Sequence, residues 1–136
     1  MKIQNTKPPI LYVEDDRVLN HLVKIYFRDS YETIGVFNAK SALEKLPLYT
    51  FRFFLLDINL GEGMNGIDLL KQIKKIPGYE KTPVIAVTAY ALEGDREYLL
   101  SSGFDGYIPK PFTKKQLLDY MEEFSIHKKN TDIKIS

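Results

Sequence analysis

The stretch that decides the fold is an apolar run that ends in an acid: Phe53-Phe54-Leu55-Leu56-Asp57-Ile58-Asn59. A strand this apolar is typical of a parallel sheet, where both faces are buried. In open α/β sheets, ligands bind outside the carboxyl ends of the strands, which is where Asp57 stands. The run therefore predicts a central parallel strand and makes Asp57 the candidate functional centre.

The composition narrows the class of protein. A chain of 136 residues with 44% hydrophobic and 27% charged residues is typical of one globular domain. A net charge of +1 argues against a large nucleic-acid footprint, and the absence of cysteine excludes disulfides, thiolate metal sites and cysteine nucleophiles. The chain has no apolar run near the roughly 18 residues of a membrane span and no signal-peptide core at its start, so we expect a cytoplasmic protein.

Strands and helices are predicted to alternate five times along the chain. Strands are expected at residues 9–13, 32–37, 51–57, 84–88 and 105–109, each followed by a helix. Asp15 or Asp16, Asn38 and Thr113 are the expected helix caps. This order predicts an α/β, doubly wound parallel sheet, and Pro109 places the fifth strand at an edge. We expect a polar arm at residues 1–8, one domain at 9–127 and a frayed polar tail at 128–136.

Polar residues end four of these strands, and their spacing brings them together. The intervals between them correspond to one or two βα repeats of roughly 20–30 residues, so all should emerge at one edge of the sheet. A lone acid at a strand end is usually a helix cap or a turn residue, but the convergence of four strand ends is more specific. The converging residues are Glu14, Asp15, Asp57, Thr88 and Lys110.

These residue types suit phosphoryl chemistry. Three carboxylates in one shallow pocket repel each other, and a divalent cation with oxygen ligands, typically Mg²⁺, relieves that repulsion. Aspartate can act as a nucleophile that forms an acyl phosphate. A phosphoryl group on Asp57 would need a cation and a hydroxyl donor, which Lys110 and Thr88 supply.

The chain resembles a bacterial two-component response-regulator receiver domain over about residues 9–127. The resemblance rests on four motifs that together are highly specific: Ile10-Leu11-Tyr12-Val13-Glu14-Asp15-Asp16, Leu55-Leu56-Asp57 through Gly66, Val87-Thr88-Ala89, and Tyr107-Ile108-Pro109-Lys110-Pro111-Phe112. It implies a flavodoxin-like sheet of order 2-1-3-4-5, as in single-domain chemotaxis regulators.

The resemblance also implies a role for each matching residue. Asp57 would accept a phosphoryl group from a sensor histidine kinase or a histidine phosphotransfer protein. Mg²⁺ or Mn²⁺ would be bound by Asp15, Asp57 and the main-chain carbonyl of Asn59, with Glu14 acting through water. Thr88 and Lys110 would contact the phosphoryl group, and the small side chain of Ala89 would leave room for it. Tyr107 matches the family's switch aromatic, and the Lys110-Pro111 bond matches one that is usually cis.

The implied protein is a phosphorelay component rather than an enzyme, with at most slow self-dephosphorylation. The surface built from its fourth helix, fifth strand and fifth helix would signal to a downstream protein, without direct nucleic-acid or membrane binding, as a monomer or a phosphorylation-dependent dimer. The chain departs from the usual pattern in having Glu14 as the first acid, a loop after Asp57 longer by about two residues, and no output domain.

Two alternatives are weaker. Gly61-Glu62-Gly63-Met64-Asn65-Gly66 is a literal dinucleotide-binding G-x-G-x-x-G, but it follows the third strand, and turn glycines at positive φ explain it. Phosphatases of the haloacid-dehalogenase type also combine Asp, Thr and Lys, but they need a second Asp where Asn59 stands.

Overall fold

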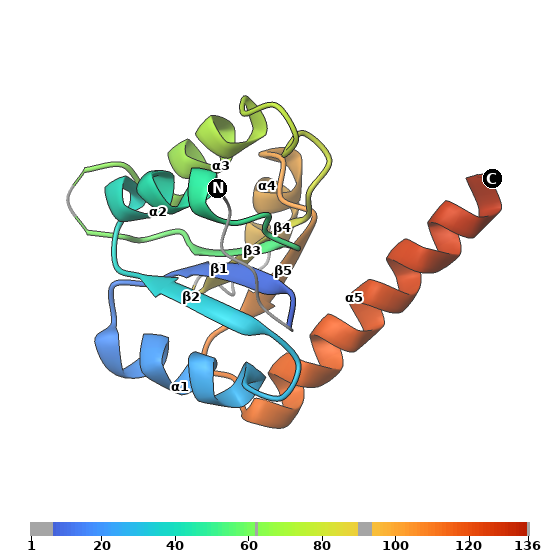
Figure 1. Cartoon of the computed structure of the whole chain (residues 1–136), viewed down its shortest axis with the longest axis horizontal. Helices are drawn as coiled ribbons and strands as arrows, with labels where there is room; N and C mark the ends of the chain where they lie inside the picture. The colour runs from blue at the N-terminus through green and yellow to red at the C-terminus, as the bar shows by residue number, and fades with distance from the viewer. Residues whose placement is uncertain (1–6, 62, 90–93, 136) are drawn as a thin grey trace.

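The structure, a computed structural model, describes residues 7–61, 63–89 and 94–135, with side chains as far as Phe124. Five parallel strands form one sheet in the order β2-β1-β3-β4-β5, which confirms the predicted order and the edge position of β5 (Figure 1). The strands and helices are β1 Pro9–Val13, α1 Arg17–Phe27, β2 Glu32–Val36, α2 Ala39–Lys45, the 3₁₀ helix η1 Leu46–Leu48, β3 Phe54–Asp57, α3 Gly66–Lys74, β4 Val84–Thr88, α4 Asp95–Ser101, β5 Gly106–Pro109 and α5 Lys114–Ile135.

Helices cover both faces of the sheet. Alternate residues of each strand point to opposite faces, so Ile10 and Tyr12 pack into the core under α1 and α5, while Leu11 and Val13 pack under α2, α3 and α4. Figure 1 shows these two helical layers on either side of the strands. The apolar run of β3 is buried because it contributes to both cores, as the sequence predicted.

The predicted helix caps are confirmed, and they explain where the helices begin. The Asp16 carboxylate accepts the N–H groups of Val18 and Leu19 at 3.0 and 3.1 Å. The Asn38 amide oxygen and the Thr113 hydroxyl cap α2 and α5 in the same way. The sequence analysis missed one cap, the reciprocal pair in which Asn65 and Asp68 begin α3.

Several boundaries differ from the prediction, and β2 and β5 do so by a single residue. β3 begins at Phe54 rather than residue 51, because Phe51 and Phe53 are buried without joining the ladder as strand residues. α5 continues to Ile135 and projects away from the sheet, through the segment expected to fray (Figure 1). The fourth helix was expected from about residue 92 to residue 102; residues 92 and 93 lie outside the described residues, and α4 as described is Asp95–Ser101.

Strand register aligns the polar residues that follow the strands. Val13 pairs with Leu56, so Glu14 and Asp57 come next, side by side, at the carboxyl ends of β1 and β3. Asp57 pairs with Val87, and Thr88 follows. The Lys110 N–H donates to the Thr88 carbonyl at 2.8 Å, which places Lys110 beside the end of β4. The sheet therefore brings four strand ends to one edge.

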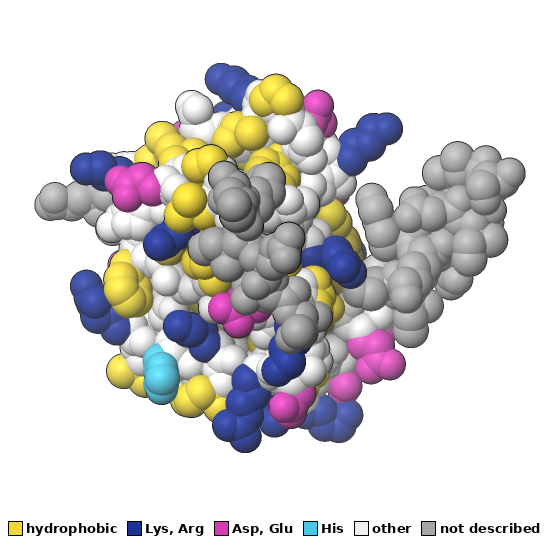
Figure 2. All heavy atoms as spheres, viewed as in Figure 1, with side chains coloured by type: hydrophobic (Ala, Val, Ile, Leu, Met, Phe, Trp, Pro, Cys, Tyr) yellow, Lys and Arg dark blue, Asp and Glu magenta, His cyan; other side chains and the backbone are white. Residues whose placement is uncertain are grey.

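The surface is mixed in character. On the face seen in Figure 2, Lys and Arg side chains are interspersed with acidic and neutral ones, and hydrophobic side chains gather over α2 and α3. Across the described residues, no helix combines the length and the apolar character that crossing a membrane requires.

Candidate functional site

The centre of the site is a buried cluster of two carboxylates and one ammonium group. Glu14 is fully buried and Asp57 is 5% exposed. Lys110 Nζ lies 2.5 Å from Glu14 Oε1 and 3.0 Å from Asp57 Oδ2, so it bridges β1 and β3 from the loop after β5. The lysine balances only one of the two buried negative charges, and this leaves the cluster with an excess of acid.

A third carboxylate lies beside this cluster. Asp15 is exposed, and its carboxylate contributes an oxygen to a group with Glu14 and Asp57 in which all three oxygens lie within 4.8 Å of one another. Oxygen-only donors with net negative charge fit a hard divalent cation such as Mg²⁺ or Mn²⁺. The residues present therefore fit the metal that the sequence predicted.

A cavity of about 250 Å³ opens onto these groups. Asp16 lines the cavity together with seven of the candidate site residues from the sequence: Glu14, Asp15, Asp57, Asn59, Thr88, Ala89 and Lys110.

The residues around Asp57 restrict its carboxylate. The Asn59 N–H donates to Asp57 Oδ1 at 3.1 Å, while Lys110 holds Oδ2. Thr88 is buried at the end of β4, and Ala89 is exposed next to it. The Lys110–Pro111 peptide bond is cis.

For both Glu14 and Lys110, burial and the hydrogen bond between the two side chains shift the pKa in opposite directions. Burial raises the pKa of Glu14; the hydrogen bond from Lys110 opposes this shift, and Asp57 adds to it. Burial acts to lower the pKa of Lys110, but its hydrogen bonds to Glu14 and Asp57 and their charges outweigh burial and raise that pKa. The raised pKa of Lys110 favours its cationic form, and burial disfavours the charged form of Glu14.

Tyr107 lies two positions before Pro109, which pairs with Thr88. The Tyr107 side chain is half-buried against the core under α4. Strand alternation places Thr88 on the same face of the sheet. The Tyr107 N–H donates to the Tyr120 hydroxyl of α5 at 2.7 Å. The backbone of Tyr107 therefore links β5 to α5.

Two residues that support the site were missed by sequence reasoning. The Tyr12 hydroxyl donates to Glu14 Oε1 at 3.0 Å. The buried Asn20 amide of α1 donates to the carbonyls of Glu14 and Val36 at 3.1 and 2.9 Å, which ties the end of β1 to β2 and to the helix. The available signals were a tyrosine inside an aliphatic strand, two residues before an acid, and an asparagine on an apolar helix face.

The glycine motif after β3 has a structural explanation. Gly61 and Gly63 have φ values of 78° and 90°, as expected for turn glycines. Gly66 has no positive φ and differs from that expectation. A Cβ there would lie 2.2 Å from the Asp57 carbonyl oxygen, so only glycine lets α3 begin so close to the strand.

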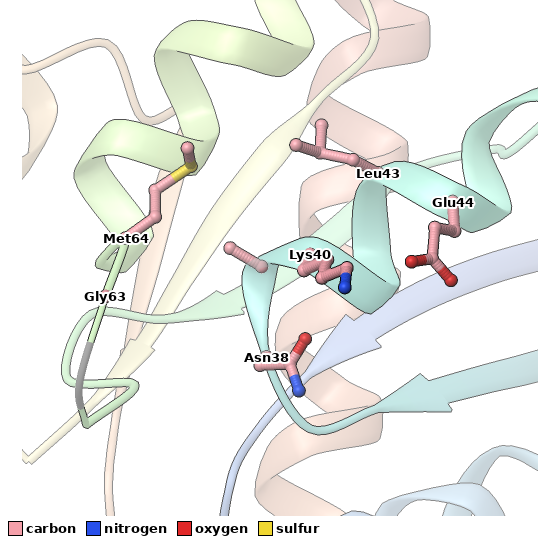
Figure 3. Close-up of a pocket in the computed structure, with 7 residues that line it drawn as sticks. Asn38, Lys40, Leu43, Glu44, Gly63 and Met64 are labelled. Atoms are coloured by element: carbon pink, nitrogen blue, oxygen red, sulfur yellow. The ribbon is translucent and has the colours of Figure 1, made fainter.

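A larger cavity of about 610 Å³ lies beside the site, between α2 and the loop that precedes α3. Figure 3 shows Met64 extending from the loop toward α2, with Leu43 and Glu44 on the helix side. Among the described residues that line this cavity, Lys40 and Glu44 are charged, and Glu44 supplies a single carboxylate. Its lining therefore offers no counterpart to the acidic cluster.

Comparison with known proteins identifies the family of this chain. The model of the response regulator receiver domain family matches residues 10–122. The chain is 32% identical over 120 residues to the polar-differentiation response regulator DivK of Brucella anthropi, which covers 85% of this chain and 94% of that protein.

Solved structures give the same result for the fold. The chain superposes on the Vibrio cholerae chemotaxis protein CheY4 with a TM-score of 0.80, covering 87% of this chain and 98% of that one, at 23% identity, a likeness that shows the fold alone. It also superposes on the receiver domain of the Pseudomonas aeruginosa sensor histidine kinase PA1611, with a TM-score of 0.76, 28% identity and coverage of 87% and 97%. That structure has a magnesium ion coordinated in its active site cleft.

Proposed function

Because the chain belongs to the response regulator receiver domain family, we propose that it accepts a phosphoryl group on Asp57 and passes the signal to a partner protein. Receiver domains are signalling domains of two-component systems that work with histidine kinases and downstream targets. The observation that carries the proposal is the bridge from Lys110 Nζ to Asp57 Oδ2, at 3.0 Å, inside a buried cluster with excess negative charge.

The proposed reaction is a transfer from a phosphohistidine of a kinase or phosphotransfer protein. One carboxylate oxygen of Asp57 attacks phosphorus, the new P–O bond forms as the P–N bond breaks, and the electron pair leaves with the imidazole nitrogen. The phosphoryl group brings extra negative charge to a buried position. Lys110 compensates for that charge, and the Thr88 hydroxyl donates to a phosphoryl oxygen.

We propose Mg²⁺ or Mn²⁺ as the metal, held by Asp15, Asp57 and the Asn59 carbonyl, with Glu14 acting through water. When bound, the cation neutralises charge that develops on the transferred group. The support in this chain is the set of carboxylate oxygens from Glu14, Asp15 and Asp57 within 4.8 Å of one another.

The proposed output is a change in the surface formed by α4, β5 and α5. Movement of Thr88 toward the phosphoryl group would leave space that Tyr107, on the same face of the sheet, turns in to fill. The link between Tyr107 and Tyr120 would carry this change to α5. Phosphorylation thus biases an equilibrium between two surface states, which a partner protein distinguishes.

The test is labelling by acetyl phosphate, a small phosphodonor, with Mg²⁺ present. The native chain should acquire one phosphoryl group, and Asp57→Ala should acquire none. Asp68→Ala, which removes an exposed acid at the start of α3, is a control for loss of a carboxylate elsewhere.

Two outcomes would contradict the proposal. Labelling that persists in Asp57→Ala would remove Asp57 from the reaction. Sustained turnover of a generic phosphomonoester by the native chain would favour the phosphatase alternative, against which Asn59 already argues.

A further inference from the structure

Tyr12 connects the apolar core to the acidic cluster. The residue is fully buried in β1, with its side chain in the core under α1 and α5. Tyr12 and Glu14 are two residues apart in extended chain, so their side chains leave the strand on the same face. The Tyr12 hydroxyl donates to Glu14 Oε1 at 3.0 Å, and this bond joins the Glu14 carboxylate to a side chain of the apolar core.

The accepting oxygen is shared with the lysine of the site. Lys110 Nζ lies 2.5 Å from the same Glu14 Oε1, and the Asp16 N–H donates to Oε2 at 3.2 Å. Both oxygens of this fully buried carboxylate therefore have a donor even when Lys110 moves away. A phenylalanine at position 12 would fill the same space but leave Oε1 with Lys110 alone.

This arrangement matters when the phosphoryl group arrives. Lys110 must turn from the carboxylates toward the phosphoryl oxygens, and a buried carboxylate oxygen that loses its donor carries a large penalty. The Tyr12 hydroxyl is neutral and held by the core, so the new charge on Asp57 does not draw it away. It keeps a donor on Oε1 throughout.

We propose that Tyr12 is a positioning residue that holds Glu14 in place and allows Lys110 to leave it for the phosphoryl group. The inference rests on the proposed function and adds a residue to it. Tyr12 acts through Glu14 and touches neither the donor nor Asp57 among the described contacts.

The test compares Tyr12→Phe with Tyr26→Phe, which removes a hydroxyl from a half-buried tyrosine packed against the same core. Mg²⁺ binding to the unphosphorylated protein is measured by calorimetry, and the phosphorylation rate is measured with acetyl phosphate at saturating Mg²⁺. We expect Tyr12→Phe to weaken Mg²⁺ binding and slow phosphorylation, each by about tenfold, the effect of one hydrogen bond to a charged group. Tyr26→Phe should stay within about twofold of the native chain in both.

A second comparison separates positioning from packing. In a Glu14→Ala background, the added Tyr12→Phe change should have no further effect on Mg²⁺ affinity or rate, because no side-chain oxygen at position 14 is left to accept the Tyr12 hydroxyl. Thermal unfolding of each variant identifies a loss that comes from the fold alone.

Native values for Tyr12→Phe in both measurements would overturn the inference, as would an effect that persists undiminished beside Glu14→Ala. A native chain that neither binds Mg²⁺ nor becomes phosphorylated would overturn the proposed function itself. The two failures are therefore distinguishable.

Discussion

Two lysine–carboxylate groups lie at opposite ends of the sheet, and they differ in charge balance and burial. At the carboxyl ends of the strands, Lys110 faces the buried acids Glu14 and Asp57. At the amino ends of β4 and β5, Lys74 Nζ lies 3.6 Å from Asp105 Oδ2, and these side chains are 25% and 40% exposed.

The pair at the amino ends is complete in itself. Asp105 Oδ2 accepts the Val84 N–H at 2.8 Å, and Lys74 Nζ donates to the Thr82 carbonyl at 2.6 Å. One lysine matches one acid, both can reach water, and both bond to the backbone that they hold together. The arrangement is that of a structural ion pair.

The group at the carboxyl ends is not balanced in charge by its own lysine. One lysine serves two buried acids, with the exposed Asp15 close by, so negative charge is in excess at a position that is largely shielded from solvent. The difference teaches that residue types alone do not identify a site. Buried charge without a compensating partner does identify a site, because such charge destabilises the fold and is retained where it serves a function.

The largest contrast is expected from removing each lysine. Lys110→Ala should slow phosphorylation of Asp57 by about 100-fold, because it removes the cation beside the transferred group. Lys74→Ala should change the rate by less than about twofold. Single-turnover labelling with a small phosphodonor measures both. Equal effects of the two substitutions would break the comparison.

A smaller contrast is expected in stability, with opposite signs. Without divalent cations near pH 7, Glu14→Gln should raise the free energy of unfolding by about 1 kcal/mol, because it relieves an excess of buried charge. Asp105→Ala should lower it by about 1 kcal/mol, because it leaves the Val84 N–H without its acceptor. Urea unfolding in the presence of a chelator measures both changes.

The pH dependence of the Glu14→Gln gain follows from the direction of the Glu14 shift. Burial raises the pKa of Glu14 above its ordinary value of 4.5, so the folded state binds the proton more tightly than the unfolded state does. The gain is therefore full above the folded pKa, shrinks as pH falls through it, and vanishes below 4.5. A gain that is independent of pH would contradict this account.

The smallest effect is expected at a third lysine–acid pair. Lys115 Nζ lies 2.6 Å from Asp119 Oδ2 on α5, and the side chains are 83% and 52% exposed. Water screens such a pair almost completely. Lys115→Ala should therefore leave both the unfolding midpoint and the phosphorylation rate unchanged. A measurable loss in either would show that exposure is a poor guide to the value of these pairs.

Much of the site could be predicted from the sequence because it depends on strand ends. Apolar runs locate parallel strands, parallel strands align their carboxyl ends, and Asp57, Thr88 and Lys110 follow directly. The cluster of Glu14, Asp15 and Asp57 is therefore brought together by topology alone.

Other features depend on contacts that a linear pattern does not contain. The bond from Tyr12 to Glu14 requires the depth of both side chains, and the role of Asn20 requires the packing of α1 on β1 and β2. The apolar residues Phe51 and Phe53 correctly predicted a buried segment, but their pattern does not distinguish a buried loop from a buried strand.

The prediction of a frayed C-terminal tail was wrong for a related reason. Residues 128–136 are polar and were expected to form a frayed tail, yet α5 continues to Ile135. Helical hydrogen bonds are local, so a helix can extend beyond the core that its stripe covers.

The most direct measurement is the position of the phosphoryl group. The native chain is treated with acetyl phosphate and Mg²⁺, and peptide mapping by mass spectrometry locates the modified residue. The account predicts one phosphoryl group, on Asp57, and none on Asp105. A phosphoryl group on any other residue, or an unmodified chain, would contradict it.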